Sequence, residues 1–391
     1  MTTIGMRAGA VPRERLEQLG LVALVGVVAA AQLSIAVAQI LLAVAGVCWL
    51  AVHVMRRERL EAPAFFWPLL GYAMLTLLAA GFSRDPAVSV EDCKQLSLFL
   101  LIPVVYDFAR GARARLLLTV VLSIGAVSAL IGVVQFAVFN YDILGRRPQG
   151  TLSHWMTYSG TLMLVICATV ARLLYDTRDR AWAAVVMPAL IVSLLLTSTR
   201  SAWVGAAAGV GVVLLLRDFR LVALLPIATA VAIAVSPAQV TDRMYSIFDL
   251  NDPTRLDRIA MLQAGAAIVK DHPLTGVGPD MVRRVYPDYR VPGAVQENNI
   301  HLHNVPMQVA AERGLPALAL WLVFVGTALV SLRPLLDRPR HRVLAATAMS
   351  ATVAMLTAGL FEYNFGDSEF LMLYLVLLTL PFAAERDGGL P

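Results

Sequence analysis

Two histidines separated by one residue, His301 and His303, offer acid–base chemistry in this sequence. They stand just before Asn304 and Pro306, residue types that often open a helix. A histidine beside a helix N-terminus feels the positive end of the helix dipole, which lowers its pKa and keeps the imidazole neutral. A neutral imidazole accepts a proton, so the pattern predicts a general base. A capping or interface histidine is the alternative for either residue.

The same pair could bind a metal ion, because imidazole nitrogen is a common metal ligand. However, no cysteine and no third obvious ligand stand nearby in the sequence. The three cysteines, Cys48, Cys93 and Cys167, are scattered without CxxC spacing, so they are expected to be ordinary core or lipid-facing residues. We therefore expect no metal and no cofactor.

Four arginines stand in polar stretches where guanidinium groups could hold an anion: Arg146, Arg147, Arg200 and Arg258. Arginine keeps its charge and offers paired donors to a phosphate. Arg200 joins two apolar segments that are each slightly short, so it should lie near a membrane interface. Each arginine also has a structural alternative. Arg200 could extend to lipid phosphates or pair with an acidic residue. Arg146 and Arg147 could be interface anchors, and Arg258 could form an exposed ion pair with Asp257.

These residues are embedded in a strongly apolar chain, with 58% hydrophobic and 15% charged residues among its 391. Soluble domains have about 25% charged residues. A bilayer core needs roughly 20 apolar residues per helix, which predicts an all-α polytopic integral membrane protein of about twelve spans. The predicted spans are 19–36, 37–54, 65–82, 95–109, 115–138, 157–174, 181–198, 201–216, 219–236, 315–332, 343–361 and 368–383.

Most of the positive charges fall on one side of these spans if the N-terminus is cytoplasmic, beginning with Arg7, Arg13 and Arg15. Because Lys and Arg concentrate in cytoplasmic loops, both termini are expected inside. The chain then divides into spans one to nine (1–236), a long outer segment (237–314) and spans ten to twelve (315–391).

The outer segment 237–314 is expected to be mostly helical. Residues 256–270 form an amphipathic helix with Ile259, Leu262, Ala266 and Val269 on one face, ended by Pro273. Residues 280–286 form a short helix, and another opens at 304–306 and runs to Gly314.

Neither the motifs nor the charge indicate a nucleotide or nucleic-acid partner. The net charge of +5 is typical of basic membrane proteins, and no basic-aromatic patch accompanies it. The sequence has no GxxxxGK[ST], HExxH or GxSxG motif. A secondary transporter remains an alternative, because twelve spans with both termini inside is a common transporter plan; but two similar halves with broken spans are missing.

Four stretches, in this order, resemble the O-antigen ligase family: Arg147-Pro-Gln-Gly-Thr; Thr197-Ser-Thr-Arg-Ser-Ala; Arg258 leading to His272-Pro-Leu-Thr-Gly-Val-Gly278; and His303-Asn-Val-Pro-Met-Gln with Glu312-Arg-Gly-Leu. The resemblance covers the chain from about the fifth to the tenth span. It implies a GT-C-like, membrane-embedded glycosyltransferase with a long helical periplasmic loop, in the bacterial inner membrane and with its active site facing the periplasm.

The resemblance also implies the reaction and its partners. The donor would be a glycan linked to undecaprenyl diphosphate, and the acceptor would be lipid A–core. Both would be bound within a membrane, among its lipids, and no nucleotide would be used. Arg147, Arg200 and Arg258 would bind the diphosphate and His303 would be the general base, with Arg146, His301 and Asn304 on the substrate. O-antigen polymerases and protein O-oligosaccharyltransferases use the same donor and remain alternatives.

Overall fold

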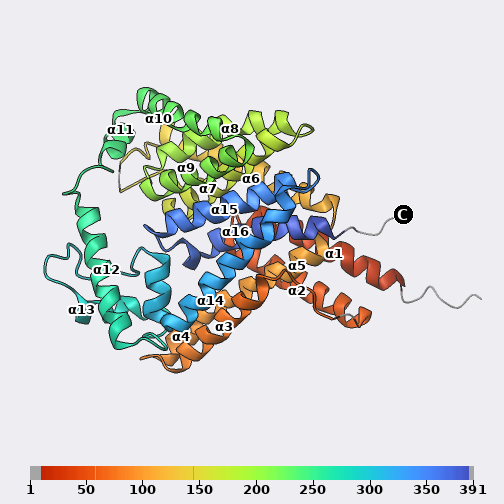
Figure 1. The fold of residues 1–391 in the computed structure, drawn as a ribbon, viewed down its shortest axis with the longest axis horizontal. Helices are drawn as coiled ribbons and strands as arrows, with labels where there is room; N and C mark the ends of the chain where they lie inside the picture. The colour runs from red at the N-terminus through yellow and green to blue at the C-terminus, as the bar shows by residue number, and fades with distance from the viewer. Residues whose placement is uncertain (1–9, 58, 144, 387–391) are drawn as a thin grey trace, which may run out of the picture.

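The computed structural model describes residues 10–57, 59–143 and 145–386, which fold into helices with no strand among them (Figure 1). Arg7 and residues 387–391 lie outside this range. The long helices and the shorter ones between them are α1 (Ala10–Ala30), α2 (Ile35–Arg56), α3 (Phe66–Gly81), α4 (Pro86–Asp92), η1 (Cys93–Leu100), α5 (Leu101–Phe108), α6 (Ala112–Ala137), α7 (Trp155–Tyr175), α8 (Arg180–Leu196), α9 (Arg200–Arg217), η2 (Phe219–Ala223), α10 (Leu224–Val235), α11 (Ala238–Tyr245), α12 (Pro253–Asp271), α13 (Val282–Tyr289), α14 (Val305–Leu336), α15 (Arg342–Gly359), η3 (Asn364–Gly366) and α16 (Ser368–Glu385).

Helices occupy all twelve ranges that the sequence predicts as spans. Within the described residues, seven helices are long and apolar enough to cross a membrane: α2, α6, α7, α9, α14, α15 and α16. Three further apolar helices, α3, α8 and the η2–α10 unit, are shorter. The predicted all-α, polytopic membrane class is therefore confirmed.

The helix α16 lies at the centre of the bundle, and nearly every residue from Phe370 to Ala384 is buried. Helices α5, α6, α7 and α15 pack around it. By contrast, the peripheral α2 exposes apolar side chains such as Val47, which is 69% accessible. Because water would penalise such a surface, its natural surroundings are lipid.

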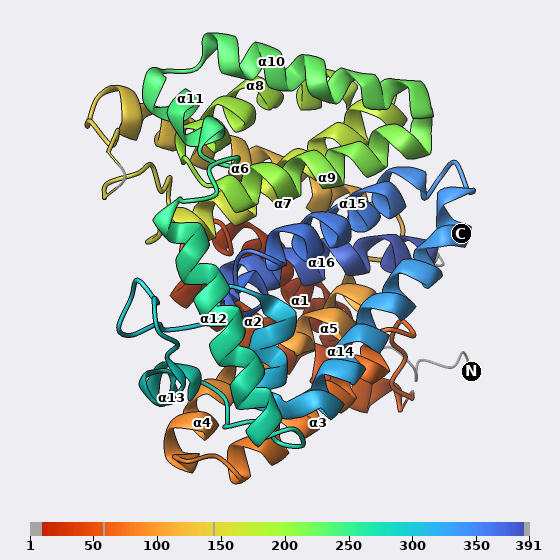
Figure 2. The ribbon, with the colours of Figure 1, turned by 60° about the vertical axis from the view of Figure 1, so that its left-hand side comes forward.

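Charged residues at the ends of several helices pair with one another. Asp107 binds both Arg110 and Arg386, and Arg56 binds Glu17, so loops that the sequence assigns to the cytoplasm meet one another. The helices α11, α12 and α13 lie at the opposite end of the molecule from the start of α1 and the end of α16 (Figures 1 and 2).

The amphipathic helix predicted at 256–270 is present as α12, but most of the apolar stripe named above is not its buried face. Ile259 and Leu262 are 44% and 36% exposed, whereas the buried stripe is Ala260, Met261, Ala264, Gly265 and Ile268. Small residues on this stripe allow α14 to approach closely: a Cβ on Gly265 would lie 2.6 Å from Cγ of Met307. Both stripes are apolar, and helical spacing alone does not show which one a neighbour covers.

A tight backbone junction joins the end of α12 to a kink in α14. The amides of Val277 and Gly278 donate to the carbonyls of Ala311 and Glu312 at 2.9 and 3.0 Å. At the kink, Gly314 has φ 82° and ψ 168°, a region open essentially to glycine alone. Two of the sequence stretches quoted above therefore fix α12, which carries Arg258, against α14, which follows His303.

We expect Gly314→Ala to lower both the thermal stability and the activity of the protein. The new Cβ would lie 2.1 Å from the carbonyl oxygen of Leu274, and the backbone strain alone costs about 1–3 kcal/mol. Gly326→Ala is the matched control, because that glycine lies in the same helix with nothing within 4 Å of an added Cβ. Equal melting temperatures of the two variants, measured in detergent, would contradict the role assigned to the kink.

Candidate functional site

A cavity of about 430 Å³ opens between α9, α12, the segment before α14 and the segment after α15. Three of the predicted site residues line it: Arg200, Arg258 and His303. Asn304, also predicted, lines it too. The exposed residues Ile259 and Leu262 of α12 supply an apolar wall.

Arg200 is the first residue of α9 and binds a carboxylate on the segment that leads into α12. Its Nη1 and Nη2 donate to the two carboxylate oxygens of Asp252, each at 3.0 Å. Nη1 also donates to the backbone carbonyl and the hydroxyl oxygen of Ser246 at 3.0 Å. Pairing with an acidic residue, the alternative considered for Arg200, is therefore what the structure contains.

Asp252 connects α9 to α12, and the sequence analysis did not select it. Besides binding Arg200, it caps α12 by accepting the backbone N–H of Arg255 at 3.2 Å. Burial acts to raise the pKa of Asp252, but the hydrogen bonds and charge of Arg200 outweigh it, and the pKa is lowered to about 2. Asp252 is therefore ionised, as a phosphate would be, and occupies the donors of Arg200.

We expect acid to destabilise the protein through Asp252. Because the folded pKa is about 2 and the ordinary value is 3.8, this carboxylate stabilises the folded protein above pH 4, and that stabilisation is lost as the pH falls towards 2. The unfolding temperature of Asp252→Asn should be lower at neutral pH and should change less between pH 4 and pH 2. Asp249→Asn, at a nearby exposed carboxylate, should behave like the wild type; an equal acid response in all three proteins would contradict this assignment.

Arg258 points its side chain into the cavity from α12 and is half-buried. Burial lowers the pKa of Arg258, and Nε has no hydrogen-bond partner among the described residues. The considered ion pair with Asp257 is not formed; Asp257 instead accepts the backbone N–H of Gln296 at 3.1 Å. Arg258 therefore lines the cavity with hydrogen-bonding capacity that no described residue uses.

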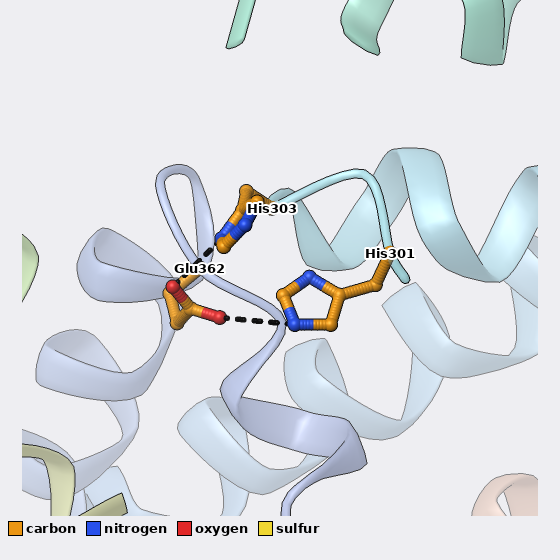
Figure 3. Close-up of side chains that lie close together, drawn as sticks. All are labelled: His301, His303 and Glu362. Atoms are coloured by element: carbon orange, nitrogen blue, oxygen red, sulfur yellow. Dashed lines mark hydrogen bonds and ion pairs between the residues drawn. The ribbon is translucent and has the colours of Figure 1, made fainter. Parts of the chain in front are cut away.

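His303 is held by a carboxylate from the segment after α15 (Figure 3). Its Nδ1 lies 2.8 Å from Oε2 of Glu362. Burial acts to raise the pKa of Glu362, but the hydrogen bond with His303 and the nearby positive charges outweigh it, so the pKa is lowered. An ionised carboxylate only accepts, so Nδ1 carries the proton and Nε2 keeps the lone pair that a base requires. Glu362 was not among the predicted site residues, although a carboxylate between two spans is a signal that could have indicated it.

His303 also has an unusual backbone conformation, with φ 47° in the left-handed region. Such strain in a non-glycine residue occurs where neighbouring contacts enforce it, often at functional sites. Here the side-chain oxygen of Asn304 accepts the N–H of Met307 at 2.9 Å, and its Nδ2 donates to the carbonyl of Leu360 at 3.1 Å. Asn304 therefore caps α14 and fixes the segment that carries His303.

His301 lies beside His303, with the ring centroids 4.2 Å apart. Its Nε2 is 3.6 Å from Oε1 of Glu362, and its Nδ1 has no hydrogen-bond partner within the described part of the chain. Burial lowers the pKa of His301 to about 4, against the opposing effect of Glu362. His301 is therefore a neutral imidazole, and Glu362 is the third potential metal ligand that the sequence did not reveal.

Arg147 lies in an adjoining cavity of about 560 Å³ that shares Ser246 with the first. Its Nη1 donates to the carbonyl of Ser198 at 3.4 Å, and its guanidinium lies 5.3 Å from the ring of Trp155. Burial lowers the pKa of Arg147 to about 10, and the positive charges of Arg243 and Arg200 act in the same direction. Arg243, which the sequence analysis missed, lies 3.7 Å from Asp252. Two cations, Arg200 and Arg243, thus contact Asp252, and the charge of Arg147 lies near both of them.

Arg146 itself lines neither cavity, although the ring of Tyr141 beside it lines the second one. Its guanidinium stacks 4.3 Å from the ring of Tyr141, beside the exposed apolar residues of α6. The structure therefore brings Arg147, but not its neighbour, towards Arg200, and contact between Arg146 and substrate stays a prediction.

Comparison with known proteins gives one family match. Residues 183–322 match the family described as O-Antigen ligase, and no curated protein matches the chain. The matched region contains Arg200, Arg258 and His303, while Arg147 and Glu362 lie outside it.

Proposed function

We propose that this protein transfers a glycan from undecaprenyl diphosphate to a sugar hydroxyl of lipid A–core. The match of residues 183–322 supports assigning the chain to the O-antigen ligase family. One observation carries the proposal: Arg200, Arg258 and His303 line a single cavity. Two cations and a base are the groups that displacement of a diphosphate by a hydroxyl requires. The reaction needs no nucleotide.

The arginines would act on the leaving group. As the bond between the anomeric carbon and the diphosphate oxygen breaks, the bonding electrons move to that oxygen, and guanidinium groups stabilise the charge. Arg258, with its Nε unpartnered among the described residues, and Arg200 would meet the diphosphate in the cavity. Asp252 would hold Arg200 in position until the donor arrives, and Arg147 and Arg243 would add positive charge from the adjoining cavity.

His303 would act on the acceptor. Its Nε2 takes the proton of the sugar hydroxyl while the hydroxyl oxygen attacks the anomeric carbon from the side opposite the diphosphate, which inverts the configuration. Glu362 would stabilise the imidazolium that forms, as carboxylates beside catalytic histidines do. With the base and the cations supplied by these side chains, the transfer would not require a metal ion.

Glu362 is expected to act as a positioning residue. Glu362→Gln should lower the transfer rate without abolishing it, because the glutamine no longer fixes the tautomer of His303 or stabilises the imidazolium. The loss should appear in the rate at saturation and leave the donor concentration needed for half-maximal rate unchanged. A purely structural role would instead lower the melting temperature together with the rate.

The orientation follows the same proposal. The cavity and α11–α13 would face the periplasm, with both termini in the cytoplasm and the protein spanning the bacterial inner membrane. The meeting of predicted cytoplasmic loops around Asp107 supports this arrangement. The exposed apolar residues Ile259 and Leu262 would contact the apolar part of a lipid-linked substrate.

The test is a transfer assay with purified protein, undecaprenyl-diphosphate-linked glycan and lipid A–core, with EDTA and without nucleotide. We expect lipopolysaccharide to gain mass on a gel. If the donor is consumed only with a peptide or a second glycan chain, the acceptor is wrong and the protein is an O-oligosaccharyltransferase or a polymerase. An inert donor would overturn the glycosyltransferase proposal and favour the transporter alternative.

A further inference from the structure

We propose that His301, His303 and Glu362 form a binding site for a divalent transition-metal ion of the Zn²⁺ class, and that the bound ion inhibits transfer. The binding part concerns only these three side chains. The inhibitory part rests on the proposed function, in which His303 is the base.

The geometry of the three ligand atoms suits a metal ion. One nitrogen of each histidine and a carboxylate oxygen of Glu362 all lie within 4.8 Å of one another (Figure 3). Zinc bonds of about 2.0–2.1 Å separate tetrahedral ligand atoms by roughly 3.3 Å. His301 Nε2 lies 3.6 Å from Oε1 of Glu362, and His303 Nδ1 lies 2.8 Å from Oε2, so small side-chain movements that bring one carboxylate oxygen beside both nitrogens complete the site.

The surroundings hold the ligands in place. Asn304 caps α14 and bonds the carbonyl of Leu360, which ties the two histidines to the segment that carries Glu362. The N–H of Leu302, between the histidines, donates to Oε1 of Gln308 at 2.7 Å. The three side chains remain 14–28% exposed, so an ion can enter, and His303 also lines the cavity.

The chemistry of the ligands selects the ion. Two imidazoles and one carboxylate are the set found at many open zinc sites. Nitrogen ligands favour Zn²⁺, Co²⁺ and Cu²⁺, whereas Mg²⁺ and Ca²⁺ prefer oxygen ligands alone. The site should therefore ignore the two abundant alkaline-earth ions.

Inhibition follows from the tautomer of His303. Its Nδ1 faces Glu362, so a metal ion there takes the Nδ1 lone pair and displaces the proton that Nδ1 donates to Glu362. A neutral imidazole has one N–H and one lone pair, so the proton then resides on Nε2. With Nε2 protonated, His303 cannot accept the hydroxyl proton of the acceptor.

Binding is tested without any substrate, by titrating Co²⁺ into the full-length protein with any affinity tag removed. We expect a saturable visible absorption spectrum at one ion per chain, which Zn²⁺ abolishes and Mg²⁺ does not. His301→Gln and Glu362→Gln should each need at least about tenfold more Co²⁺. His272→Gln, at another histidine on the same side of the bundle, should bind like the wild type. No saturable spectrum, or unchanged binding in both ligand variants, would overturn the site.

Inhibition is tested in the transfer assay. Zn²⁺ should stop transfer by the wild type, EDTA should restore it, and His301→Gln should require at least about tenfold more Zn²⁺, relative to its own metal-free rate. Binding of Co²⁺ without inhibition by Zn²⁺ would overturn the tautomer argument. If the metal-free protein transfers nothing, the proposed function fails, and the Co²⁺ titration still decides the site.

Discussion

Replacing His303 by alanine is expected to reduce glycan transfer by about 10²–10⁴-fold while the protein stays folded. The cavity contains one imidazole whose Nδ1 is engaged by Glu362 and whose Nε2 is therefore free to accept a proton. Removing it leaves the arginines and hence donor binding, so the loss should appear in the catalytic rate more than in the donor concentration needed for half-maximal rate.

The backbone at His303 decides which control variants are informative. Alanine is disfavoured at φ 47°, whereas asparagine tolerates the left-handed region. His303→Asn should therefore melt like the wild type and be as inactive as His303→Ala. His272→Gln should keep full activity. An active, folded His303→Asn protein would refute the base assignment.

The sequence predicted the spans because the bilayer imposes a simple rule on it: each crossing needs a long apolar run. It also placed Arg200, Arg258 and His303 at one end of the bundle, and these three do line one cavity. Polar residues between apolar runs are few, so each was conspicuous by itself.

The partners of these residues were not predictable in the same way. Asp252 is 52 residues from Arg200, and Glu362 is 59 residues from His303. Only the packing of α12 and α15 against the bundle brings these pairs together, and no local spacing encodes it. The buried face of α12 was missed for the same reason, since it depends on where α14 lies.

The junction between α12 and α14 explains stretches that carry no reactive group. Gly276 has φ 64°, and a Cβ there would lie 2.3 Å from the backbone of Glu312. Gly276 and Gly314 allow the two backbones to touch, which holds the segment after α12 against the kink in α14. Sequence reasoning recognised the stretches by resemblance, but their physical role appears only in three dimensions.

Arg200→Lys is expected to lower transfer roughly 10²-fold, although the charge is kept. The guanidinium of Arg200 contacts both oxygens of Asp252 and two oxygens of Ser246 at once, each at 3.0 Å. A lysine ammonium is a single point with three donors and cannot span a carboxylate and a diphosphate in the same plane. The loss should appear both in the donor concentration needed for half-maximal rate and in the rate at saturation.

Arg217→Lys is the matched control, because this arginine ends the same helix and stacks on Tyr175 instead of lining the cavity. Its activity should equal that of the wild type.

The melting temperature of Arg200→Lys, compared with that of Asp252→Asn, separates two roles of the pair. If Arg200 only anchored Asp252, both variants would lose stability together and Arg200→Lys would keep its activity once folded. A folded Arg200→Lys protein with greatly reduced transfer would instead show that the paired donors serve the diphosphate, with Asp252 holding them in its absence.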